Sequence, residues 1–254
     1  MTTAYLGRDV AYKCSYENND FTPEEWSDGF FASEDDVETL TVTITENVKT
    51  ISKFMFARRP ITEITVPASV ELIDDYAFYD CTSLSKITFT ESTMPLNIGF
   101  QPFNNEVGPF YQSPLTEINL NRQLNATYAS KLDQNDEGIF SCSRRTEAIT
   151  KLAMNNLTSI SDYMFYGMNL ESIEIPVSVT SIGNKAFAEN PNLLLISLRH
   201  KNAPTLGNDV FDGHKEGDLN FNVNPRALDQ YTGEANWPQA EIGIYYHGVP
   251  AFDK

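Results

Sequence analysis

Apolar residues recur along this chain at fixed offsets, separated by polar residues. The clearest block begins at Ile61 and reads ITEITVPASVELIDDYAFYDCTS, and a second block, LESIEIPVSVTSIGNKAFAENPN, begins at Leu170 in the same frame. Each block places three aliphatic residues before a proline, two after it, and a phenylalanine near its end. A match of this extent predicts a solenoid, in which the chain winds through one short structural repeat after another.

The spacing within one block predicts its local structure. Ile64 and Val66 lie two positions apart, as on a strand with one face toward the core. Pro67 ends that strand because proline cannot donate a backbone hydrogen bond. A second short extended segment with Val70 and Ile73 follows, and then a compact turn holds the phenylalanine. One repeat cannot cover its own apolar face, so we expect the repeats to stack around one continuous core.

Five further copies are degenerate, but their phenylalanines place them. These are Phe56, Phe103, Phe140, Phe165 and Phe211, which with the two clear copies make about seven repeats over residues 40–213. We expect one interior column formed by Phe56, Phe78, Phe103, Phe165, Phe187 and Phe211. The interval from Phe56 to Phe78 is 22 residues, whereas Phe103 to Phe140 spans 37. The middle of the array is therefore predicted to contain insertions at residues 104–114 and 121–147.

Segments 61–84 and 170–193 resemble the BspA-type leucine-rich repeat, whose consensus is approximately L-x-x-I-x-I-P-x-S-V-x-x-I-G-x-x-A-F-x-x-C-x-x-L. Both contain the Ser-Val and Ala-Phe pairs of that consensus, and the second also contains its Ile-Gly pair. The resemblance covers roughly residues 40–213 and is lost between 104 and 147. It implies a right-handed array of short parallel β-strands with turns and short helical segments, capped at both ends. It also implies adhesion and partner binding.

The two ends of the chain lack the repeat frame. Residues 1–39 are rich in aromatic and acidic residues, and they are interpreted either as an N-terminal cap or as a docking segment anchored by the cluster from Trp26 to Phe31. Residues 214–254 contain an alternating strand, a helix started by proline, and then Tyr231 and Trp237. We expect this segment to be a C-terminal cap that seals the last repeat.

Charge narrows the classes of partner. The formal net charge is −17 and the pI is near 4.5. Nucleic-acid binding depends on clusters of Lys and Arg, and an anionic membrane surface also attracts basic segments, so both partners are disfavoured. No stretch approaches the ~20 apolar residues of a membrane span. The first residues lack the pattern of a signal peptide, so we expect a location inside a cell or in a virion, and the cell surface only if a leader is missing.

Motifs of catalysis and metal binding are absent from the sequence. It has no G-x-S-x-G elbow, Walker-type loop, H-E-x-x-H or EF-hand loop. Cys81 and Cys142 follow repeat phenylalanines and Cys14 stands apart, so the thiols are interpreted as structural and no disulfide is expected. Paired acidic residues lack the spacing of calcium ligands. We therefore expect no enzymatic activity, no cofactor and no metal.

The predicted insertions are the first candidate for a partner-binding surface, because aromatic and arginine side chains are favoured at interface centres. The candidate residues are Phe110, Tyr111, Arg122, Tyr128, Arg144 and Arg145, together with Trp26 in the N-terminal segment. Phe110 and Tyr111 could instead tuck back as local core.

The outward positions of the predicted strands are the second candidate surface. They form a row of Thr43, Thr65, Thr88, Asn119, Ala153, Glu174 and Ser197. This polar row either binds a partner or only keeps the protein soluble. The sequence thus favours a non-enzymatic binding or scaffold protein that recognises a protein or cell-surface component. The alternative is a structural or accessory component of a larger assembly such as a bacteriophage virion.

Overall fold

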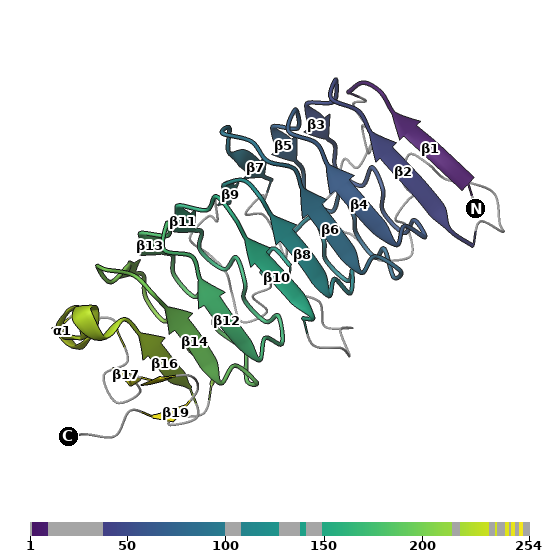
Figure 1. Cartoon of the computed structure of the whole chain (residues 1–254). Coiled ribbons are helices and arrows are strands. Elements are labelled where there is room, and N and C mark those ends of the chain that lie inside the picture. The colour runs from purple at the N-terminus through teal and green to yellow at the C-terminus, as the bar shows by residue number, and fades with distance from the viewer. Residues whose placement is uncertain are drawn as a thin grey trace.

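The computed structural model describes residues 2–9, 38–99, 108–126, 138–140, 149–214, 219–233 and 237, with three pairs at 242–243, 245–246 and 249–250. The described chain is an elongated array of short parallel strands, with β1 at one end and α1 at the other (Figure 1). The predicted repeat solenoid is therefore confirmed. None of the helices in this part of the chain is long and apolar enough to span a membrane.

One side of the array consists of the first strand of each repeat. We call this side the strand face (Figure 1). In three hydrogen-bonded sets it contains β1 (Thr2–Leu6) with β2 (Leu40–Ile44); β4 (Glu63–Val66), β6 (Lys86–Phe89), β8 (Glu117–Leu120) and β10 (Lys151–Met154); and β12 (Ser172–Ile175), β14 (Leu195–Leu198), β16 (Asn220–Val223) and β17 (Ile242–Gly243). Within each set neighbouring strands are parallel, as stacked coils of a solenoid require.

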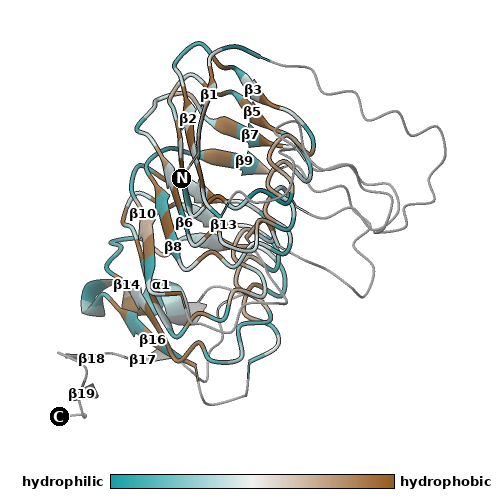
Figure 2. Ribbon diagram, turned by 90° about the vertical axis from the view of Figure 1, so that its right-hand side faces the viewer, coloured by the Kyte–Doolittle hydropathy of each residue, from teal (hydrophilic) through white to brown (hydrophobic). Residues whose placement is uncertain are grey.

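Shorter strands form a second stack beside the first (Figure 2). They are β3 (Thr50–Ile51), β5 (Leu72–Ile73), β7 (Leu96–Ile98) and β9 (Leu124–Ala126), followed by β11 (Ser159–Ile160), β13 (Ser181–Ile182) and β15 (Thr205–Leu206). Two strands near the end of the chain, β18 (Tyr245–Tyr246) and β19 (Val249–Pro250), pair antiparallel.

Alternation of apolar and polar residues sets the orientation of each strand. In β2, Leu40, Val42 and Ile44 are buried while Thr41 and Thr43 are exposed. The same alternation continues through the stacked strands, so equivalent aliphatic side chains meet in register, as when Ile64 pairs with Ile87 and Ile87 with Ile118. The inward residues of all repeats join in one hydrophobic core.

A compact turn closes each coil and points one phenylalanine inward. The positions two before and two after this phenylalanine have positive φ angles, as at Tyr76 (53°) and Asp80 (52°) around Phe78. The same geometry recurs at Phe54, Arg58, Gln112, Tyr163, Gly167, Lys185, Glu189, Asp209 and Gly213. This left-handed conformation costs energy for residues other than glycine, so its repetition shows that packing of the phenylalanine dictates the shape of the turn.

The phenylalanines form one column, with one correction to the prediction. Ring centroids of successive members are 5.2 to 6.3 Å apart, in the order Phe56, Phe78, Phe110, Phe140, Phe165, Phe187 and Phe211. Phe110 therefore occupies the place that we expected for Phe103, which lies outside the described residues.

The boundaries of the predicted insertions change with this correction. Residues 108–115 form the turn and the start of the next repeat, so the first group of extra residues lies between Gly99 and Gly108. Strand β9 likewise belongs to the repeat, and so does Phe140. The extra residues of the second region therefore lie between Ala126 and Gly138 and after Phe140, outside the described residues.

The position three residues after the phenylalanine has a structural role. Cys81 Sγ donates to the carbonyl of Phe56 (3.0 Å), and Ser113 Oγ donates to that of Phe78 (2.6 Å). Asn190 Nδ2 donates in the same way to the carbonyl of Phe165 (2.8 Å). Burial raises the pKa of the Cys81 thiol to about 12. The structural interpretation is therefore confirmed for Cys81, while Cys14 and Cys142 lie outside the described residues.

The described ends of the array extend and close this core. At the start, β1 pairs with β2, and Asp9 Oδ1 accepts from the backbone N–H groups of Lys49 and Thr50 at 2.6 and 2.9 Å. At the other end, a 3-10 helix (Pro225–Ala227) leads into α1 (Leu228–Gly233). Trp237 then packs against Phe211, Phe221 and Tyr231 and donates to the carbonyl of Pro204 at 3.2 Å. These aromatic rings close the phenylalanine column.

Candidate functional site

The strand face presents two rows of outward side chains. Strand register places Thr65 beside Thr88, Thr88 beside Asn119, and Asn119 beside Ala153. Glu174 lies beside Ser197 in the following set. The row that the sequence predicts is therefore confirmed within these two sets. Asn119 Nδ2 donates to Thr88 Oγ1 at 3.3 Å, which links neighbouring members of the row.

The other row alternates in charge across four strands. Glu63 pairs in register with Lys86, Lys86 with Glu117, and Glu117 with Lys151. Lys86 Nζ lies 3.0 Å from Glu63 Oε2. The pKa of Lys86 is raised, chiefly by this hydrogen bond and by the charge of Glu63, with a smaller effect of Glu117. Although the protein is acidic, this part of the strand face is balanced in charge.

The strand face is interrupted between β10 and β12. These two described strands belong to different hydrogen-bonded sets, and no backbone hydrogen bond joins them. The turn after β10 is one residue shorter than the turn after β12: Met154 to Leu157 is three positions, whereas Ile175 to Val179 is four. Asn156 has a φ of 62° in this shortened turn.

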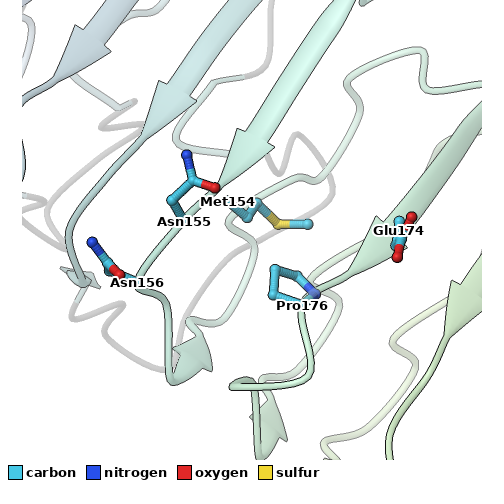
Figure 3. Close-up of a pocket in the computed structure, with 5 residues that line it drawn as sticks. All are labelled: Met154, Asn155, Asn156, Glu174 and Pro176. Carbon is cyan, nitrogen blue, oxygen red and sulfur yellow. The ribbon is translucent and has the colours of Figure 1, made fainter.

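A hollow of about 420 Å³ lies at the interruption. Its lining consists of Met154, Asn155, Asn156, Glu174 and Pro176. Figure 3 shows Met154 and Asn155 at the end of β10, with Pro176 and Glu174 on the neighbouring coil. The hollow thus lies between two coils whose strands do not pair.

The second stack of strands is also interrupted, but there a side chain bridges the two coils. The Gln123 amide oxygen accepts from the backbone N–H of Thr158 at 3.0 Å, and its Nε2 donates to the carbonyl of Ser159 at 3.0 Å. The amide therefore acts as a substitute for a peptide group between β9 and β11. No such amide bridges the described residues of β10 and β12, so that split remains open to the hollow.

Phe110 and Arg122, two residues that the sequence predicts to bind a partner, lie in the interior. Phe110 is fully buried in the phenylalanine column, so the alternative interpretation as core is correct for this residue. The Arg122 side chain is also fully buried. Neither side chain is available to a partner, and both assignments are corrected.

Arg122 is buried because its guanidinium group satisfies backbone carbonyls of two preceding coils. Its Nη2 and Nε donate to the carbonyl of Met94 at 2.7 and 3.1 Å. Its Nη1 donates to the carbonyls of Val70 (3.0 Å) and Ala68 (3.2 Å), and more weakly to that of Pro67 (3.4 Å). Burial lowers the pKa of Arg122, and the charge of Glu71 opposes this shift. Five donors in a fixed fork suit such a set of acceptors.

Tyr111 is half-buried and stacks on Tyr79, with ring centroids 5.8 Å apart. Tyr79 belongs to a second aromatic group on the turns, in which Phe54 stacks on Tyr76 and Arg58 lies over the Tyr79 ring. The structure thus joins Tyr111 to this group. The remaining candidates, Tyr128, Arg144, Arg145 and Trp26, lie outside the described residues.

Two further signals in the sequence concern Phe110 and the turn after Met154. Leu115 follows Phe110 by five positions, as Ile61 follows Phe56, which identifies Phe110 as a repeat phenylalanine. The segment from Met154 to Leu157 is one residue shorter than the V-P-A-S-V and I-P-V-S-V segments, which indicates that this coil departs from the two clear repeats.

Ionisable side chains elsewhere in the described ranges do not converge on a reactive centre. No group of three or more His, Cys, Asp or Glu residues in these ranges could hold a metal ion. His200 is buried and its Nε2 lies 2.9 Å from the carbonyl of Val179. Desolvation lowers the pKa of His200, although hydrogen bonds to the Val179 and Pro176 carbonyls oppose this shift. Its position between coils indicates a structural role.

Comparison with known families gives one match. The family model described as BspA type leucine rich repeat region matches in six copies, over residues 12–130, 49–194 and 108–232. These ranges together cover most of the chain and include every repeat of the phenylalanine column. No curated protein matches the chain.

Proposed function

We propose that this chain, which belongs to the BspA-type leucine-rich repeat family, is a binding or scaffold protein whose strand face recognises a protein or cell-surface component. Leucine-rich repeat domains generally mediate protein interactions, and this family is typically non-enzymatic. The observation that carries the proposal is the in-register row of short polar side chains on the strand face. It includes Thr65, Thr88 and Asn119, and each lies on a strand of the rigid array.

The physical advantage of this face is preorganisation. Thr and Asn side chains are short, so they lose little conformational entropy when a partner orders them. Each offers both a donor and an acceptor of hydrogen bonds. Strand pairing holds the backbones of Thr88 and Asn119 on both sides and that of Thr65 on one side, and the neighbouring row from Glu63 to Lys151 is balanced in charge. Recognition over β4 to β10 would therefore depend on hydrogen bonds and shape more than on net charge.

The sequence supports a contribution from the loops as well. Tyr111, Tyr128, Arg144, Arg145 and Trp26 remain proposed contacts, because aromatic and arginine side chains concentrate binding energy. Cationic residues are uncommon in this acidic chain, which makes the Arg144-Arg145 pair suitable for an anionic patch on a partner.

Site-specific crosslinking tests the strand face directly. A photoreactive phenylalanine analogue at Thr88 should capture the partner from extracts of the source organism, and the captured protein or surface component can then be purified for titration. Thr88→Arg combined with Asn119→Arg should weaken its binding at least tenfold, because two long cations would displace the partner from the flat row.

The matched control is Asn97→Arg combined with Asn125→Arg. Thr88 and Asn119 are half-buried, and these two asparagines are exposed, on the parallel strands β7 and β9 of the other stack. We expect this pair to bind normally and both pairs to keep the melting temperature. If the Thr88 and Asn119 pair binds normally while Arg144→Ala with Arg145→Ala loses the partner, the binding surface lies on the loops.

A further inference from the structure

We propose that the hollow between β10 and β12 binds the ammonium group of a lysine side chain from a partner protein. The assignment of this lysine to a partner protein rests on the function proposed above. The lining of the hollow combines acceptors of hydrogen bonds with an apolar surface.

The side chains at the rim present acceptors rather than donors. Asn155 Nδ2 donates to Asn121 Oδ1 at 2.8 Å, which leaves the Asn155 amide oxygen turned toward Met154 (Figure 3). Asn156 Nδ2 donates to Glu91 Oε1 and to the Asn121 carbonyl, each at 3.3 Å. The amide donors are thus engaged with Asn121 and Glu91. The side-chain acceptors that remain at the hollow are the Asn155 amide oxygen and the Glu174 carboxylate.

The backbone at the split adds further acceptors. Successive residues of a parallel strand point their N–H and C=O groups alternately to the two neighbouring strands. Lys151 and Ala153 are the residues of β10 that can bond to β8, since Lys151 N donates to the Thr116 carbonyl. Both the N–H and the C=O groups of Leu152 and Met154 therefore point toward β12. No backbone hydrogen bond joins the two described strands, so these carbonyls are open to the split.

The apolar part of the lining suits the stem of a lysine. Met154 lines the hollow although it is only 4% exposed, and Pro176 lines it from the neighbouring coil (Figure 3). A lysine has four methylene groups and a compact ammonium with three donors, so it can cover an apolar wall while its charge meets several acceptors. The net charge of −17 also favours a basic partner.

Arg199 acts as an internal competitor for this site. Its Nε lies 3.2 Å from Glu174 Oε1, and both side chains are largely exposed, at 77% and 60%. An exposed ion pair of this kind is weak and exchanges readily. A lysine ammonium that pairs with Glu174 and also reaches the β10 carbonyls would displace Arg199 from Glu174.

The test uses the whole protein with methyl-labelled methionines and a small probe, Nα-acetyl-lysine methylamide. Titration should shift the NMR signal of the Met154 methyl group, while the signals of the buried Met55, Met164 and Met168 stay in place. The same compound with an acetylated Nε has the same stem without the charge, and it should leave Met154 unchanged.

Three variants assign the binding to the named groups. Glu174→Gln should weaken the probe about two- to fivefold, as expected for loss of one exposed charge pair. Arg199→Ala should strengthen it by a similar factor, because the competitor is gone. The matched control is Glu63→Gln, which removes another exposed strand-face carboxylate that pairs with a cation, and it should leave the affinity unchanged.

Each other outcome overturns the proposal. Absence of a Met154 shift, an equal shift with the acetylated probe, or equal weakening by Glu63→Gln would show that the hollow does not recognise an ammonium group. If the probe fails but the Thr88 and Asn119 pair still abolishes partner capture, only this inference fails. If the probe binds and that pair has no effect, the hollow stands and the wider strand face is excluded.

Discussion

Replacement of Arg122 by methionine separates a structural role from a partner-binding role. Methionine keeps an unbranched side chain of similar length but removes the donors that reach the carbonyls of Met94, Val70 and Ala68. The carbonyl of Val70 belongs to a fully buried residue, so it would lose its partner with little access to water. We expect the variant to lose stability and to keep the binding surface.

The magnitude follows from the acceptors that are left behind. A buried carbonyl without a partner costs about 1–3 kcal/mol, and hydrogen bonds from charged donors contribute about 1.5–3 kcal/mol each. The Met94 and Ala68 carbonyls can regain water, because Met94 is exposed and Ala68 is half-buried. Removal of a desolvated cation offsets part of the loss. We therefore expect the free energy of unfolding to fall by about 2–4 kcal/mol.

Urea unfolding followed by circular dichroism measures this change. Arg122→Lys should fall between the wild type and Arg122→Met, since one ammonium cannot reproduce the planar fork. Arg199→Met is the matched control: it removes an exposed arginine with one ion pair and should cost less than about 1 kcal/mol. If Arg122→Met unfolds like the wild type but loses the partner, the structural argument is wrong and the sequence-based assignment is restored.

Three further predictions concern the core. Phe110→Ala should lower the free energy of unfolding by about 3–5 kcal/mol because it empties the middle of the phenylalanine column. Leu194→Ala at an exposed site should change the free energy of unfolding by less than about 0.5 kcal/mol. Equal effects of the two variants in urea titrations would contradict the column. Desolvation lowers the pKa of His200 in the folded protein, so its contribution to stability is complete above the pKa of the unfolded state, near 6.5, and is lost as the pH falls below that value. The difference in melting temperature between pH 7.5 and pH 5.5 should therefore be smaller for His200→Gln than for the wild type. An unchanged difference would refute this prediction. With Cys14 and Cys142 replaced by serine, Cys81 should not react with a thiol reagent at pH 8 until the protein is unfolded, because its pKa is raised to about 12; rapid reaction of the native protein would show that the thiol is accessible.

The repeat architecture could be predicted from the sequence because the residue pattern of each repeat specifies its own local structure. Alternation at Ile64 and Val66 identifies a strand, Pro67 its end, and Phe78 the inward turn, and the structure has all three features. The equivalent positions from Leu170 onward repeat these signals. Since a solenoid contacts mainly its neighbours, a correct repeat frame implies the outward row as well. The neighbours Thr65, Thr88 and Asn119 were predicted on this basis.

Burial of single residues could not be predicted in the same way, because it depends on which segment completes a coil. Phe103 follows Ile98 by five positions, as Phe78 follows Ile73, whereas Phe110 precedes Leu115 by five, as Phe56 precedes Ile61. Stacking on Phe78 and Phe140 selects Phe110. Arg122 is charged and lies in a predicted insertion, so its sequence indicates a surface residue. Its donors meet carbonyls from residues 28 to 55 positions away, and no local pattern encodes such a set.

The sequence by itself thus determined the fold, the outward row and the structural place of Cys81, because short-range periodicity specifies which side chains of a strand or turn face the core. Only the tertiary structure decided which phenylalanine joins the column and where Arg122 lies. It also decided that β10 and β12 separate at the shortened turn after Met154. These features depend on the alignment of one coil against another, which residues far apart in the sequence determine together.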